Sequence, residues 1–148
     1  MKTKKFGKIH TYSLLLVFLF IAIISCNKNP YNRLLGTWEN KQPTYTETYI
    51  YDGINFDAVS YKMKVKSIIC SSDASGIIYG KYTENTYDSS VVGKYYAVSF
   101  KDLTYSSISI SGAYKNGKMA ADSLVEAINE FTINNGYYGT YSSCKKVK

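Results

Sequence analysis

The protein has 148 residues, with 18 lysines and arginines against 11 aspartates and glutamates, so its formal net charge is +7. Four of these lysines and the only histidine, His10, lie within residues 1–25, which leaves 14 basic and 11 acidic residues and a net charge of +3 beyond them. This small charge excludes the basic surface typical of nucleic-acid binding, and the lack of histidine excludes Ser-His-Asp catalysis and histidine metal sites.

Residues 1–25 have the pattern of an export signal. Their basic residues are Lys2, Lys4, Lys5 and Lys8, and no acid accompanies them. The apolar run LLLVFLFIAII follows over residues 14–24. It is shorter than the roughly 20 residues that a membrane-spanning helix needs, but it suits the apolar middle of a secretory signal with a basic start. We therefore predict a signal peptide over residues 1–25.

The end of the apolar run resembles the lipobox of bacterial lipoproteins. Ile23, Ile24, Ser25 and Cys26 give an aliphatic residue, two spacers of which the last is small, and a cysteine. The resemblance implies that cleavage leaves Cys26 first and that its thiol carries a diacylglycerol, which anchors the chain to the membrane. It further implies a lipidated tether over residues 26–33 in the bacterial cell envelope, at the outer membrane by analogy with enteric sorting. The alternative is a chance cysteine after an ordinary signal or membrane anchor.

From Leu34 onward, strand patterns dominate. Residues 44–51 alternate between two faces, and Asp52-Gly53 after them predicts a tight hairpin turn with two positive φ angles. In residues 58–70, Val59, Tyr61, Met63 and Val65 share one face, whereas a serine and three lysines occupy the other. A helix would scatter those lysines around its axis, so this alternation predicts a strand.

Further strand patterns follow towards the C-terminus. They cover residues 76–83, 94–103, 104–115 and 137–147. Ile108 and Ile110 face away from the serines between them, and Asn116-Gly117 is a second hairpin signal. Seven or eight short strands favour a barrel or a sandwich.

One helix interrupts the strands, at residues 122–131. Ser123 and Glu126 have the spacing of a capping box, in which side chains satisfy the free amides of the first turn. Leu124, Ala127, Ile128 and Phe131 then share one face. We expect a short amphipathic helix that packs over an end of the β domain.

Gly36-Thr37-Trp38, just after the tether, is similar to the G-x-W motif of lipocalins and of small lipocalin-like (calycin-type) lipoproteins. The resemblance implies a domain over residues 34–148 that is all-β, an antiparallel up-and-down barrel of about eight strands with one short helix near the C-terminus; a β-sandwich is the second choice. It also implies that Gly36 and Trp38 have a structural role at the barrel base and that the barrel binds a small apolar ligand. The candidate ligand-binding residues are Val59, Tyr61, Met63, Val65, Ile108 and Ile110.

Two residue types leave alternatives open. Cys70 and Cys144 form a disulfide if the exported chain is oxidised, or remain two thiols. Of the 16 tyrosines, 15 lie beyond the signal. They either stabilise the sheet through cross-strand contacts or line a pocket.

No residue pattern indicates catalysis. The acids are scattered, and no G-x-S-x-G motif occurs beyond the signal. We expect a binding protein that is not an enzyme, with no catalytic residues, no metal and no cofactor. The alternatives to ligand binding are a protein-binding module, because residues 111–114 and Cys144 resemble membrane-bound inhibitors of C-type lysozyme, and a purely structural or antigenic surface protein.

Overall fold

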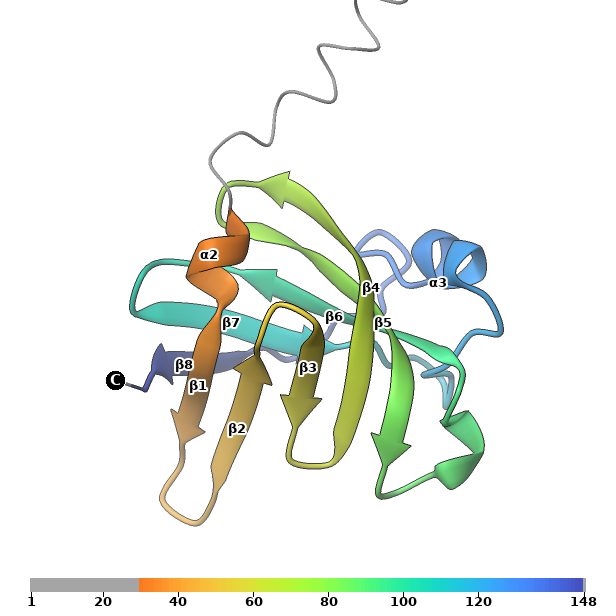
Figure 1. The fold of residues 1–148 in the computed structure, drawn as a ribbon, viewed down its shortest axis with the longest axis horizontal. Helices are drawn as coiled ribbons and strands as arrows, with labels where there is room; N and C mark the ends of the chain where they lie inside the picture. The colour runs from red at the N-terminus through yellow and green to blue at the C-terminus, as the bar shows by residue number, and fades with distance from the viewer. Residues whose placement is uncertain (1–29, 148) are drawn as a thin grey trace, which may run out of the picture.

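Eight antiparallel strands form a closed barrel in the computed structural model, which describes residues 30–147 (Figure 1). Each strand pairs with the next along the chain, and β1 pairs with β8 through Trp38–Lys146 and Glu39–Lys145 to close the ring. The strands are β1 (Gly36–Lys41), β2 (Thr46–Tyr51), β3 (Asn55–Ala58), β4 (Tyr61–Ser72), β5 (Ser75–Asn85), β6 (Tyr95–Lys101), β7 (Ser107–Gly112) and β8 (Ser142–Lys146). The predicted antiparallel barrel is confirmed, and the sandwich is not formed.

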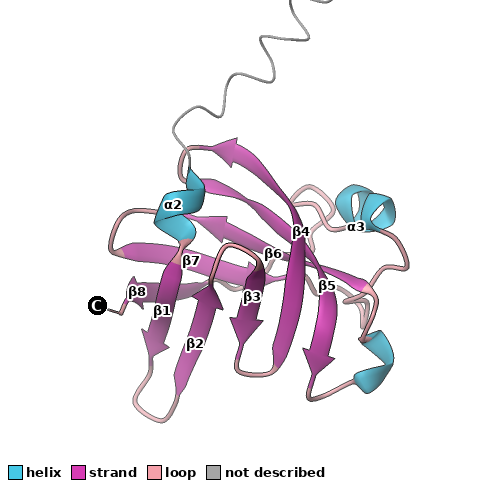
Figure 2. Ribbon diagram, in the orientation of Figure 1, coloured by secondary structure: helices cyan, strands magenta, loops and turns pink. Residues whose placement is uncertain are grey.

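In the described part of the chain, three short helices accompany the strands (Figure 2). They are α2 (Pro30–Leu34), the 3-10 helix η1 (Ser89–Val91) and α3 (Leu124–Glu130). None of the helices within residues 30–147 is both long enough and apolar enough to span a bilayer. The predicted signal peptide, Cys26 and the first part of the tether lie outside the described residues.

The barrel interior is packed with side chains from every strand. Because successive residues of a strand point to opposite faces, the paired residues Phe56–Met63, Ile78–Val98 and Phe100–Ile110 all point inward. Each of these six side chains is at most 3 % exposed. Side chains buried this completely fill the middle of the barrel and leave no room there for a ligand.

The end of the barrel next to α2 is closed. Trp38 is 1 % exposed, and its indole Nε1 donates a hydrogen bond to the Leu34 carbonyl oxygen at 2.8 Å. Lys146 Nζ lies 4.9 Å from the centroid of the Trp38 ring and donates to the Arg33 carbonyl oxygen. Glycine is favoured at residue 36 because its φ of 122° lies in a region that residues with a side chain rarely adopt. Gly36 and Trp38 thus both lie at the closed end of the barrel.

The helix α3 covers the outer wall of β5 and β6, not an end of the barrel as expected (Figure 1). Its predicted apolar face is confirmed, since Ala127 and the following Phe131 are fully buried. Tyr79, which points outward from β5, donates its hydroxyl hydrogen bond to the Phe131 carbonyl oxygen at 3.2 Å. The helix thus protects a strand face that would otherwise expose a large aromatic side chain.

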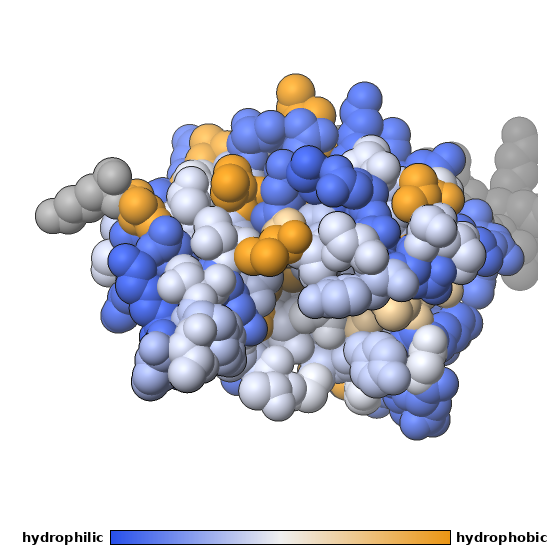
Figure 3. Space-filling model, turned by 90° about the horizontal axis from the view of Figure 1, so that it is seen from below, coloured by the Kyte–Doolittle hydropathy of each residue, from blue (hydrophilic) through white to orange (hydrophobic). Residues whose placement is uncertain are grey.

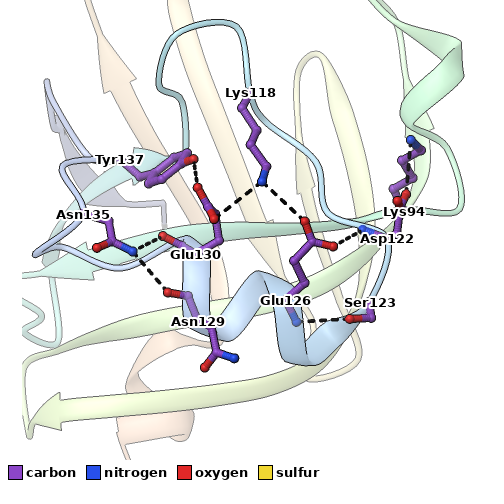
Figure 4. Close-up of polar contacts among 9 residues, drawn as sticks. All are labelled: Lys94, Lys118, Asp122, Ser123, Glu126, Asn129, Glu130, Asn135 and Tyr137. Carbon is purple, nitrogen blue, oxygen red and sulfur yellow. Dashed lines mark hydrogen bonds and ion pairs between the residues drawn. The ribbon is translucent and has the colours of Figure 1, made fainter.

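Polar contacts hold the ends of α3 (Figure 4). The Ser123 hydroxyl accepts from the Glu126 amide at 3.1 Å, as the capping-box spacing predicts, but the Glu126 carboxylate accepts from the Asp122 amide instead of that of Ser123. Near the other end, Glu130 accepts a hydrogen bond from the Tyr137 hydroxyl. Lys118 lies 3.4 Å from the Glu126 carboxylate and 3.5 Å from that of Glu130.

The two hairpin signals adopt different turns. Asn116 and Gly117 both have positive φ, at 50° and 81°, as predicted. At the other signal only Gly53 does, at 97°, because the Asp52 carboxylate closes the turn by accepting from the amides of Ile54 and Asn55. These hydrogen bonds hold the pKa of Asp52 below its ordinary value. The prediction of two positive φ angles is therefore wrong there, although the hairpin between β2 and β3 is formed.

The last strand is shorter than predicted. β8 begins at Ser142, whereas the pattern indicated a strand from residue 137. Tyr137 to Tyr141 instead cross the outside of the wall, where the Tyr141 hydroxyl lies 2.9 Å from Ser99 Oγ and the Tyr138 hydroxyl donates to the Phe131 carbonyl oxygen. Aromatic side chains that suit a strand are used here to cover β5 and β6.

Candidate functional site

The end of the barrel opposite α2 is open and contains a pocket of about 410 Å³. The loops between β1 and β2, β3 and β4, and β5 and η1 surround this open end, which we call the mouth (Figure 1). Figure 3 looks onto the mouth from below and shows a hollow bordered by residues of intermediate hydropathy. The lining residues are Tyr45, Thr46, Glu47, Thr48, Tyr49, Ala58, Val59, Ser60, Tyr61, Tyr87, Tyr96 and Gly112.

Aromatic rings from five strands form the floor of the mouth pocket. Tyr61 packs edge-on against Tyr96, with ring centroids 5.2 Å apart and ring planes at 82°. Tyr96 stacks on Tyr82 at 4.8 Å, and Phe56 joins Tyr61 to Tyr49 at 6.5 and 6.1 Å. Ring pairs at these separations stabilise one another beyond their burial alone, so the rings of the floor support one another.

Gly112 makes room for this cluster. A Cβ at residue 112 would lie 2.2 Å from the Tyr96 hydroxyl oxygen, so any side chain there would push the ring away. Gly112 pairs with Val98 on β6 and lines the pocket itself. A glycine within a sheet often marks such a close approach of another group.

The phenols of the floor remain uncharged in ordinary conditions. Burial raises the pKa of Tyr61, Tyr82 and Tyr96 above the usual value of 10.0. Burial also raises the pKa of Tyr49, and the hydrogen bond with Ser142 opposes this shift. The floor therefore offers neutral ring faces and hydroxyl groups to a ligand.

Glu47 is the only acidic residue that lines the mouth pocket, and no lysine or arginine lines it. Its position follows from the alternation of β2, which points Glu47, Tyr49 and Tyr51 to the same inner side. The carboxylate accepts a hydrogen bond from Asn40 Nδ2 at 2.9 Å, on the neighbouring strand β1. Its charge contributes to raising the pKa of Tyr49 and of Cys144, which also point inward.

The predicted ligand-binding residues divide into two groups. Tyr61 and Val59 line the mouth pocket. Met63, Ile108 and Ile110 are 0 to 3 % exposed and belong to the packed core, so no space lies beside them. Val65 packs against that core and does not line the pocket.

The position of Val59 differs from the prediction that it shares the inner face of β4 with Tyr61. It precedes β4 and lies in the turn after β3, with its side chain 74 % exposed. The inward alternation begins only at Tyr61, and irregular pairing between Val65 and Ser67 interrupts it later. Val59 therefore contributes to the rim of the mouth and not to the interior.

Several pocket residues were not singled out from the sequence. They are Tyr45, Glu47, Tyr49, Tyr87, Tyr96 and Gly112. The alternation of residues 44–51 placed Glu47 and Tyr49 on one face, but it did not say which face is inside. Tyr87 and Gly112 reach the pocket only through the barrel closure, which no local pattern specifies.

The structure contains no disulfide between Cys70 and Cys144, so the first of the two alternatives, the candidate disulfide, is not formed. Cys70 is on β4 and Cys144 on β8, four places apart in a ring of eight strands, which puts them on opposite walls. A disulfide requires Cα atoms within about 7 Å. Burial raises the pKa of the Cys144 thiol to about 12, which makes it unreactive near neutral pH.

Residues 111–114, which resemble part of the lysozyme inhibitors, do not form a projecting loop. Ser111 and Gly112 end the strand β7, and Ser111 and Ala113 are buried. Only Tyr114 is well exposed, at 61 %.

A second hollow, of about 430 Å³, lies along the seam of β1 and β8. Its lining is largely charged and includes Glu39, Lys41, Lys145 and Lys146. It has no aromatic residue in its lining, so it lacks the ring faces that small apolar ligands prefer. Within residues 30–147, no group of three or more Cys, Asp or Glu side chains is arranged to hold a metal ion.

No family model matches the chain, and no curated protein matches it. Among solved structures, the crystal structure of pallilysin from Treponema pallidum is similar, with a TM-score of 0.49 and 9 % sequence identity. The match covers 96 % of this chain and 100 % of that chain. Similarity at this level carries no argument about what this protein binds or does.

Proposed function

We propose that the protein is a lipid-anchored protein of the bacterial envelope that binds a small apolar molecule at the mouth of its barrel. The observation that carries the proposal is the pocket of about 410 Å³ lined by Tyr45, Tyr49, Tyr61, Tyr87 and Tyr96. Ligand pockets of proteins typically have 300–1,000 Å³ and apolar or aromatic walls with a few polar groups. The dense core below the pocket confines the ligand to the mouth.

The anchor and the mouth lie at opposite ends of the barrel in this proposal. The described chain starts at α2, beside the closed end, and the mouth is at the far end (Figure 1). A diacylglycerol on Cys26, a few residues before α2, would hold the closed end towards the membrane and leave the mouth facing solvent. This arrangement suits a protein that takes up its ligand from the surrounding compartment.

Binding at the mouth is tested with the neutral fluorescent probe N-phenyl-1-naphthylamine. The protein used is residues 27–148, which retains every strand of the closed barrel. We expect fluorescence enhancement on binding, and at least a tenfold weaker affinity for Tyr87→Ser, because this side chain lines the pocket yet is 86 % exposed and supports no core contact. Loss of one ring contact of about 1.4 kcal/mol corresponds to that factor.

The matched control is Tyr105→Ser. Tyr105 is 83 % exposed and lies in the loop after β6, at the closed end, where Arg33 Nη1 contacts the Leu103 carbonyl oxygen. Its replacement should leave the probe affinity unchanged. Absence of probe binding, or an equal loss in both variants, would contradict the proposed site.

The anchor is tested by growth with radiolabelled palmitate followed by cell fractionation. We expect the wild-type chain to carry label and to sediment with membranes, and Cys26→Ser to carry none and to be released. Cys70→Ser and Cys144→Ser are the matched controls and should keep the label, because these cysteines belong to the barrel wall. An unlabelled wild-type chain would refute the anchor and leave the mouth-binding result untouched.

A further inference from the structure

The carboxylate of Glu47 is held inside the mouth pocket without a cationic partner. Five ion pairs occur among the described residues, and their acids are Glu39, Glu84, Asp122, Glu126 and Glu130. Glu47 is in none of them, although Lys41 is close in sequence and pairs with Glu39 instead, at 3.1 Å. A half-buried carboxylate is unfavourable unless an opposite charge or several hydrogen bonds compensate for its lost hydration.

The position of this carboxylate is fixed by its neighbours. Asn40, opposite Glu47 on β1, is 9 % exposed and donates to its Oε2 at 2.9 Å. Asn40 is itself held, because its Oδ1 accepts from Gln42 Nε2 at 2.9 Å. This chain of side chains keeps the negative charge inside the mouth instead of letting it swing out to water.

Neutral ring faces surround the carboxylate. Tyr49 follows it on the same face of β2, and Tyr61 and Tyr96 form a corner, with ring planes at 82°. Tyr45 and Tyr87 extend the wall outward, at 54 % and 86 % exposure. The faces of aromatic rings attract cations, most strongly where water is partly excluded, and cages of such rings bind quaternary ammonium groups.

We propose that the ligand of the mouth pocket is an organic cation, a quaternary or tertiary ammonium group on an apolar body, with Glu47 as its counter-ion and the tyrosine rings as its walls. This inference rests on the proposed function, because it names the chemistry of the molecule bound at the same site. The apolar body packs on the rings near the floor, and the ammonium group lies beside the carboxylate. Anions are disfavoured because no lysine or arginine lines the pocket.

The test compares two ligands that differ only in charge. Benzyltrimethylammonium and its neutral carbon analogue neopentylbenzene are titrated separately into residues 27–148 by calorimetry or ligand-observed NMR. We expect the cation to bind at least tenfold more tightly than the neutral analogue. The preference should shrink between 20 and 500 mM NaCl, because salt screens the attraction of a partly exposed charge.

The deciding variant is Glu47→Gln, which keeps an oxygen that can accept the Asn40 hydrogen bond and removes the charge. It should abolish the preference for the cation and leave the affinity for neopentylbenzene unchanged. The matched control is Glu39→Gln, the same change one strand away on the outside of the wall, where Glu39 lines the β1–β8 seam and not the mouth. It should keep the full preference.

The possible failures are distinguishable. If the neutral analogue binds as tightly as the cation, or if Glu47→Gln and Glu39→Gln behave alike, the assignment of a cationic ligand is wrong while binding at the mouth stands. If neither compound binds and N-phenyl-1-naphthylamine also fails, the mouth is not a binding site. Circular dichroism of each variant verifies that the barrel remains folded.

Discussion

Replacing Trp38 by alanine is expected to lower the free energy of unfolding by about 3–5 kcal/mol, the cost usual for removing a buried tryptophan from a core. Trp38 is 1 % exposed and fills the closed end of the barrel. Its loss also removes the hydrogen bond to the Leu34 carbonyl oxygen and the ring under Lys146. Because domains of this size are stable by only about 5–15 kcal/mol, the variant should unfold at a much lower urea concentration.

The measurement is urea unfolding followed by far-ultraviolet circular dichroism, since the variant contains no tryptophan to fluoresce. Trp38→Phe keeps most of the ring and loses the indole hydrogen bond, so its cost should be about half as large. Tyr105→Ala, at an exposed site of the same end, should stay within about 0.5 kcal/mol of the wild type. A cost below about 1 kcal/mol for Trp38→Ala would show that the closed end is not packed as described.

The stability of the barrel is expected to fall steeply above pH 10. Tyr82 and Tyr96 are 2 % and 7 % exposed, and burial raises the pKa of both above the value of 10.0 that they have when unfolded. Above that pH the unfolded chain loses these protons and the folded chain keeps them. The contribution of these two residues to the free energy of unfolding is therefore fully present below pH 10. It falls as pH rises above 10, by about 1.4 kcal/mol per pH unit for each of the two residues.

Urea unfolding at pH 8, 10.5 and 11.5 measures this loss. The double variant Tyr82→Phe/Tyr96→Phe keeps both stacked rings and removes both hydroxyls together, so it should be nearly as stable as the wild type at pH 8. It should lose clearly less stability between pH 10.5 and 11.5. Tyr105→Phe, at an exposed position, serves as control and should follow the wild type. Equal pH dependence of all three proteins would mean that the floor tyrosines ionise without unfolding the barrel.

Sequence patterns predicted the architecture well because strand periodicity and turn residues are local signals. The alternation in β4 and β7 placed Met63, Ile108 and Ile110 on inner faces, and each is buried. The G-x-W motif located the first strand and its closing tryptophan. The apolar spacing of residues 124–131 likewise identified the buried face of α3.

The candidate site was predicted only in part, because it depends on where the core stops. An inward side chain near mid-barrel is enclosed by all eight strands, whereas one near a strand end lines a hollow. Periodicity separates inside from outside but not these two depths, so Met63 and Tyr61 had the same expected role. Whether Cys70 and Cys144 come close enough for a disulfide could not be predicted for a related reason, since local sequence does not say which strands oppose each other across a closed ring.

The closed end has a practical consequence for spectroscopy. The protein has one tryptophan, and it lies buried beside α2, where its indole donates a hydrogen bond to the Leu34 carbonyl oxygen. The wavelength of its emission will therefore report whether the chain is folded. Tyrosine absorbance will respond to ligand binding at the mouth, so one sample gives two optical signals: tryptophan emission for folding and tyrosine absorbance for binding.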